Sequence, residues 1–180
     1  SDLVGEYPEL QGVMGKYFAL AQGFEEDVAN SVSDHYLPTG LTSILPKKAF
    51  SYSISIVDKI DTLVGFFLID EKPTSSKDPF ALRRAAIGLL RIIIENKLSF
   101  KLRDLISYAI RLYQEQGVSI KNEKTEQQVL EFIKERMRNV LKLKNIKNDI
   151  IEASISSHAG DNFLALYEKT ILMNKYKNKG

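Results

Sequence analysis

The sequence has 180 residues, with no cysteine and no tryptophan. Its 44% hydrophobic and 27% charged residues and formal net charge of +2 are typical of a globular protein and exclude an intrinsically disordered chain. Without cysteine there is no disulfide framework, thiolate zinc site or thiol nucleophile. Apolar runs such as 66–69 are too short to cross a bilayer, and no signal peptide opens the chain, so we expect a cytoplasmic protein.

Apolar residues recur every three or four positions along nearly the whole chain, which is the period of an amphipathic helix. The most regular stripe predicts a helix over 47–69, with Pro46 suited to its start. In chain order, helices are predicted over 8–21, 25–36, 47–69, 79–96 and 102–116, from Thr125 onward, and over 149–157 and 161–174. No segment favours a strand over a helix. The predicted fold class is therefore all-α, a helical bundle followed by a second, smaller helical group.

A polar stretch containing Gly117 predicts the division between the two helical groups. We expect a helical domain at 1–113, a connection at 114–124 and an additional helical segment at 125–180. The start at Ser1 without a methionine suggests an excised part of a longer protein. Charge differs between the halves: residues 1–90 hold 8 Lys and Arg against 12 Asp and Glu, and residues 91–180 hold 17 against 11. The basic second half is either a set of solvated helix faces or a surface for a polyanion, and composition does not decide between them.

The segment 72–84 combines a polar loop with the start of a helix. Asp78 is predicted as the helix cap, because its carboxylate can accept the free N–H groups of the first turn. Pro79 then occupies the first helical position. Arg83 and Arg84 follow about 100° apart around the helix, so they cannot lie along one line. One of them is available for a ligand while the other pairs with a carboxylate.

Two carboxylates, Asp58 and Asp61, lie one helical turn apart within the predicted helix over 47–69. Because charges in so apolar a helix need partners, we interpret them as a structural acidic pair that joins neighbouring helices through Arg or Lys. A metal site would need histidines, yet His35 and His158 are the only two and neither lies in a ligand-spaced motif. No metal site is predicted, and no nucleotide-loop, serine-elbow or kinase motif indicates a catalytic residue.

Four segments carry a resemblance to a known family: 9–15 (ELQGVMG), 35–38 (HYLP), 58–65 (DKIDTLVG) and 77–86 (KDPFALRRAA). In sequence, order and spacing they closely resemble the beta subunit family of bacterial heterotetrameric glycyl-tRNA synthetases. The likeness is strongest over about the first hundred residues and weaker beyond Gly117.

The resemblance implies a ligase of two alpha and two beta subunits that uses ATP and magnesium. In the family, the alpha subunit activates glycine with ATP, and the beta subunit mainly binds tRNA(Gly). The region is similar to the helical HD phosphohydrolase fold, here degenerate: Asp58 resembles the late metal-binding aspartate, but the His-Asp pair is absent. The resemblance therefore implies partners in tRNA(Gly) and the alpha subunit, no cofactor bound by this fragment, and no membrane or DNA partner.

The expected function is tRNA binding for glycylation, without a catalytic site in the fragment itself. Phosphates are bound by cationic side chains and favoured near helix N-termini, so the expected tRNA-binding residues are Lys77, Arg83, Arg84 and Arg91. Two alternatives are a metal-dependent HD-type phosphohydrolase that uses Asp58, and a purely structural module that spaces domains or contacts the alpha subunit.

Overall fold

The computed structural model describes residues 5–7, 10–74, 77–158 and 160–177, and its regular structure is helical throughout these ranges. In chain order the helices are α2 (Val13–Ala21), α3 (Glu26–Asp34), α4 (Ala49–Leu68), α5 (Leu82–Glu95), α6 (Leu102–Glu115), α7 (Thr125–Lys142), α8 (Asn148–Ser156) and α9 (Phe163–Lys177). The all-α prediction is confirmed. None of the helices in the described ranges has the length and hydrophobicity needed to span a bilayer.

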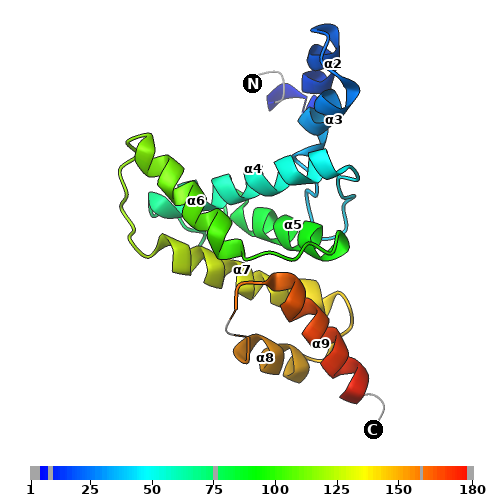
Figure 1. The fold of residues 1–180 in the computed structure, drawn as a ribbon, viewed down its shortest axis with the longest axis vertical. Helices are drawn as coiled ribbons and strands as arrows, with labels where there is room; N and C mark the ends of the chain where they lie inside the picture. Colours follow the sequence, from blue (N-terminus) through cyan, green and yellow to red (C-terminus); the bar gives the residue numbers. More distant parts are fainter. Residues whose placement is uncertain (1–4, 8–9, 75–76, 159, 178–180) are drawn as a thin grey trace.

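The centre of the molecule is a group of helices around α4. Helix α4 packs against α3, α5, α6 and α7 and leaves one face exposed (Figure 1). Its buried positions recur at the helical period and include Ile56, Ile60, Leu63, Val64 and Phe67. These side chains meet apolar residues of α5 and α7 in one hydrophobic core, whereas Phe50, Ile54 and Val57 of the same helix are exposed.

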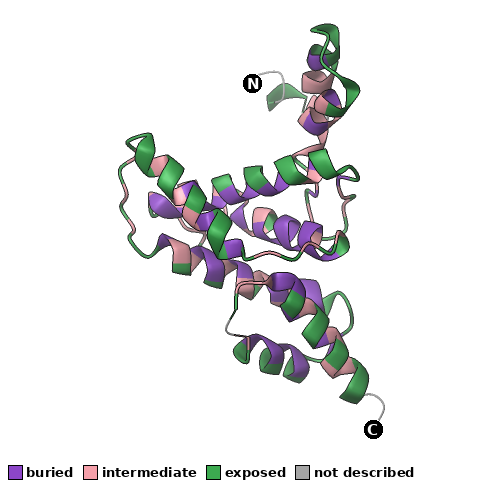
Figure 2. Cartoon of the chain, viewed as in Figure 1, coloured by how far each residue is buried: buried purple, intermediate pink, exposed green. Residues whose placement is uncertain are grey.

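The two ends of the molecule differ in how they join this centre. Helices α2 and α3 form a pair that projects from the start of α4, while α8 and α9 lie beyond α7 at the opposite end (Figure 1). Buried residues are concentrated in the central helices, and both outer pairs expose much of their surface (Figure 2). The core nevertheless continues through α7 into Ile151 of α8 and Leu166 of α9. The division at 114–124 into two domains therefore stays a prediction, because one core runs across it.

Two glycines bring α2 close to α3. A Cβ atom on Gly15 would lie 2.7 Å from Cγ1 of Val32, and one on Gly12 would lie 2.9 Å from the carbonyl oxygen of Ser33. Gly12 also has φ = +78° at the start of α2, a conformation that other residues rarely adopt. Close helix packing thus explains both glycines. It also explains why α2 begins at Val13, whereas the predicted start at residue 8 lies outside the described residues.

Candidate functional site

The start of α5 is capped by Asp78, which lies four residues before the first helical residue. Asp78 accepts two backbone hydrogen bonds, from Leu82 N to Oδ1 at 2.8 Å and from Arg83 N to Oδ2 at 3.0 Å. The chain turns between these groups, and Ala81 has the left-handed φ of +55°. The predicted helix start at Pro79 is therefore wrong by three residues: α5 begins at Leu82, because the carboxylate reaches over a turn instead of lying next to the first helical residue.

The four cationic residues expected to bind tRNA divide into two pairs. The guanidinium of Arg83 donates to the carbonyl oxygen of Thr74, and Nη1 of Arg91 donates to the carbonyl oxygen of Gly40 at 2.6 Å. Both side chains are half-buried and hold loops against the bundle. The other pair, Lys77 and Arg84, is exposed, and neither forms an ion pair within the described part of the chain.

The acidic pair of α4 faces outward. Asp58 and Asp61 are both exposed, and no ion pair among the described residues involves either of them. The interpretation that they join neighbouring helices through Arg or Lys thus finds no partner in this part of the chain. The helix turns both carboxylates toward water, which solvates them.

The charge that α4 does bury is Lys59, which the sequence interpretation missed. Its side chain is 4% exposed. Its ammonium donates to the carbonyl oxygens of His35 and Leu37, each at 3.0 Å, and to Oγ of Ser55 at 2.8 Å. Burial lowers the pKa of Lys59 to about 8, although the nearby Asp58 carboxylate acts to raise it. The three hydrogen bonds make this burial tolerable and fix the end of α3 against α4.

Two signals could have pointed to Lys59. It lies four residues after Ser55 and four before Leu63, so it belongs to the buried stripe of α4. Gly88 of α5 supplies the second signal, since a Cβ atom there would lie 2.8 Å from Cε of Lys59 and 3.1 Å from the carbonyl oxygen of Pro38. Gly88 leaves the room that the long side chain of Lys59 needs. This second signal becomes visible only when α5 is packed against α4.

All four segments that carry the family resemblance contribute residues to a hollow of about 350 Å³ beside Lys59. Asp58 lines it from α4 and Arg84 from α5, so the tertiary structure brings a carboxylate and a guanidinium to one place. The remaining lining combines aromatic rings with hydroxyl and amide groups: Gln11, Tyr36, Pro38, Thr39, Lys59, Thr62, Phe80, Ala81 and Ala85. We call this feature the α4–α5 hollow. It combines positive charge, hydrogen-bonding groups and flat apolar surfaces.

A neighbouring hollow of about 350 Å³ contains Asp58, the residue on which the phosphohydrolase alternative depends. His35, Asp58 and Asp61 all line it, together with apolar residues of α3 and α4. In the described ranges, however, no three His, Cys, Asp or Glu side chains come close enough to hold a metal ion together. His158, the other histidine, lies near α7 and beside Gly160, and burial is the main cause that lowers its pKa.

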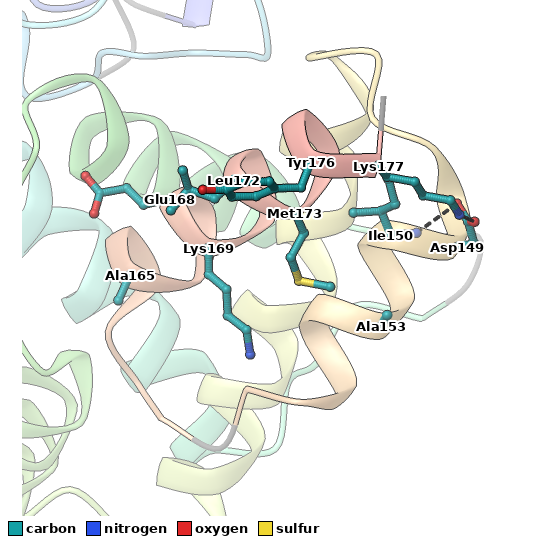
Figure 3. Close-up of a pocket in the computed structure, with 10 residues that line it drawn as sticks. All are labelled: Asp149, Ile150, Ala153, Ala165, Glu168, Lys169, Leu172, Met173, Tyr176 and Lys177. Atoms are coloured by element: carbon teal, nitrogen blue, oxygen red, sulfur yellow. Dashed lines mark hydrogen bonds and ion pairs between the residues drawn. The ribbon is translucent and has the colours of Figure 1, made fainter. Parts of the chain in front are cut away.

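A larger hollow, of about 850 Å³, separates α8 from α9 and has a different character. Figure 3 shows Met173 extending from α9 toward α8, while an ion pair between Asp149 and Lys177 lies at one end. Much of the lining is apolar, including Ile150 and Leu172. We call this feature the α8–α9 groove. It offers hydrophobic contact, and none of the residues expected to bind tRNA lies in it.

The chain thus combines an all-helical fold with exposed cations beside an aromatic and polar hollow. The chain matches the family model described as glycyl-tRNA synthetase beta subunit over residues 1–156, and it belongs to this family. The resemblance found in the four sequence segments is thereby confirmed.

Individual relatives agree. The chain is 39% identical to the glycine–tRNA ligase beta subunit of Rickettsia canadensis, covering 98% of this chain and 27% of the relative. It is 37% identical to that of Paracoccus denitrificans, covering 97% and 24%, and 46% identical to that of Pseudomonas syringae, covering 77% and 20%. The chain thus spans about a quarter of the length of the relatives that it matches.

Proposed function

We propose that this chain is part of the beta subunit of a cytoplasmic glycine–tRNA ligase and helps to bind tRNA(Gly). In this proposal the alpha subunit joins glycine to the tRNA with ATP and magnesium, and the present chain contributes no catalytic residue. Family membership supports the class of enzyme. The observation that carries the tRNA contact is the exposure of Lys77 and Arg84 on either side of the Asp78 cap.

The cap decides how a phosphate can be bound at this place. The first N–H groups of a helix often bind phosphate directly. Here, however, the carboxylate of Asp78 already accepts hydrogen bonds from Leu82 N and Arg83 N. A tRNA phosphate therefore contacts the side chains of Lys77 and Arg84 rather than the backbone of α5. Arg83 supports them indirectly, because its bond to the carbonyl oxygen of Thr74 ties the preceding loop to the helix.

Within the basic second half of the chain, the cations of α7 support the proposal less than their charge suggests. In α7, Arg138 forms two hydrogen bonds with Glu152, at 2.8 and 2.9 Å, and Lys134 donates to the carbonyl oxygen of His158 at 2.9 Å. Arg136 contacts Glu135 and lies over the ring of Phe132. Because these three cations already have protein partners, we assign the tRNA contact to the start of α5 rather than to this face of α7.

The test is a salt titration of tRNA(Gly) affinity by fluorescence anisotropy. The double variant Lys77→Ala/Arg84→Ala should weaken binding and reduce the slope of log K against log salt by about 2, one for each lost phosphate contact. The control is Arg111→Ala/Lys147→Ala, which removes the same charge from exposed positions on α6 and before α8. An unchanged slope in the first variant, or an equal change in the control, would contradict the assignment.

One observation keeps the phosphohydrolase alternative open: His35 and Asp58 line the same hollow. Elemental analysis of the purified chain, with an assay on nucleoside monophosphates, separates the two functions. Stoichiometric metal with turnover would replace our proposal. The purely structural alternative is tested by a beta subunit that lacks residues 1–113, since full tRNA affinity in that protein would favour it.

A further inference from the structure

We propose that the α4–α5 hollow binds a single unstacked nucleotide of an RNA strand, with the base between aromatic rings and the phosphate at Arg84. The identity of that RNA as tRNA rests on the function proposed above, whereas the nucleotide site rests on the hollow itself. Its volume of about 350 Å³ lies within the range of small-molecule sites, roughly 300–1,000 Å³.

Two aromatic rings give the hollow its stacking surfaces. Tyr36 is 39% exposed and Phe80 is 41% exposed, and both line the hollow. Each ring is supported by another: the centroids of Phe80 and Phe66 are 3.9 Å apart with the rings stacked, and those of Tyr36 and His35 are 3.9 Å apart with the rings tilted. Rings that are already held lose little entropy when a base stacks on them. Unpaired RNA bases are recognised in this way.

The polar groups of the hollow match the two ends of a nucleotide. Arg84 presents a guanidinium, which binds a phosphate through two parallel hydrogen bonds. Asp58 presents a carboxylate, which repels phosphate but accepts a hydrogen bond from the amino group of a base. The phosphate therefore lies on the Arg84 side and the base edge on the Asp58 side. Cytosine, adenine and guanine carry such an amino group and uracil does not, so the hollow should discriminate against uracil.

Lys59 contributes to this site by positioning the wall rather than by binding the nucleotide. Its ammonium already donates to the carbonyl oxygens of His35 and Leu37 and to Ser55. These bonds fix the backbone on either side of Tyr36 against α4. They therefore hold the ring of Tyr36 in place at the hollow. The positive charge that can bind a phosphate at the rim is therefore that of Arg84.

The experiment titrates the chain with single-stranded RNA hexamers of cytidine or of uridine and follows backbone amide signals by NMR. The cytidine hexamer should shift the signals of the hollow and bind more tightly than the uridine hexamer. Tyr36→Ala, Phe80→Ala and Arg84→Ala should each weaken binding about tenfold, and Asp58→Asn should reduce the preference for cytidine. Tyr108→Ala and Arg111→Ala, at exposed positions on α6, are the matched controls and should have no effect.

Circular dichroism establishes that each variant is folded, and a variant that is not folded is replaced by Tyr36→Leu, Phe80→Leu or Arg84→Gln at the same position. Hexamers that shift no signal in the hollow, or controls that lose as much affinity as the variants, would overturn the nucleotide site. If hexamers bind in the hollow but tRNA(Gly) does not bind the chain, the site stands and the proposed function fails. If tRNA binds with the salt dependence given above while the hollow stays unperturbed by hexamers, the function stands and the site fails.

Discussion

The α4–α5 hollow and the α8–α9 groove show that the larger cavity need not be the more informative one. The groove has a volume of about 850 Å³ and a mostly apolar lining. The hollow has about 350 Å³, yet it brings together Asp58, Arg84 and two aromatic rings from separate segments. Convergent polar groups indicate a specific ligand, whereas an apolar lining alone indicates only hydrophobic contact. We therefore propose the smaller feature as the functional site.

The same two regions differ in the state of their cations. At the groove, Lys177 pairs with Asp149, and Arg138 of α7 forms a bidentate ion pair with Glu152 of α8. At the rim of the hollow, Arg84 is exposed and forms no ion pair within the described ranges. A cation that already has a carboxylate partner loses that partner when it binds phosphate, so free and paired cations contribute differently to RNA affinity.

The largest loss of stability should come from a side chain placed at Gly88, beside Lys59 and beneath the α4–α5 hollow. Gly88→Val places methyl groups against Lys59 and the backbone oxygen of Pro38, where a Cβ atom alone would already be 2.8 and 3.1 Å away. We expect it to lower the free energy of unfolding by about 3 kcal/mol, measured by urea denaturation. Gly40→Val is the matched control, because a Cβ there meets nothing within 4 Å. Equal stability of the two variants would contradict the packing described for Lys59.

A smaller effect, with a distinctive pH dependence, is expected for Lys59→Met. At neutral pH the variant should lose about 2 kcal/mol, because two carbonyl oxygens lose their ammonium donor. The folded pKa of Lys59 is about 8, below its ordinary value of 10.5. Between these values the unfolded state binds more protons, so this group makes wild-type stability rise with pH. The gap between wild type and variant should therefore widen from about pH 8 to 10.5.

Urea denaturation at several pH values measures this gap directly. Lys142→Met, at an exposed position on α7, is the control and should stay within about 0.5 kcal/mol of wild type throughout. A gap between wild type and Lys59→Met that narrows as the pH rises would show that Lys59 is not buried as described.

The smallest loss of stability is expected for Arg138, which pairs with Glu152 between α7 and α8. Arg138→Ala removes an ion pair between side chains that are 34% and 53% exposed, so it should cost only about 0.5 kcal/mol of stability. It should also leave the salt dependence of tRNA binding unchanged, unlike Arg84→Ala. The same anisotropy titration checks this. A slope that falls as much for Arg138→Ala as for Arg84→Ala would remove the distinction between paired and free cations.

The sequence by itself determined the helices, because their apolar periodicity is a local property that packing preserved. Predicted bounds of 47–69 and 102–116 correspond to α4 at Ala49–Leu68 and α6 at Leu102–Glu115. Four short segments were also enough to indicate the family. Local chemistry identified Asp78 as a cap but not the start of α5, since the turn around Ala81 depends on how the loop reaches the bundle.

Only the tertiary structure decided which charges face the core and which remain free. On α4, Lys59 is buried and Asp58 is exposed, although they are adjacent in sequence; carbonyl groups at the end of α3 and the space above Gly88 make the difference. Arg83 and Arg84 are adjacent too, yet only Arg83 reaches the carbonyl oxygen of Thr74. The partner of a charged side chain is supplied by distant parts of the chain, and helical periodicity carries no information about those contacts.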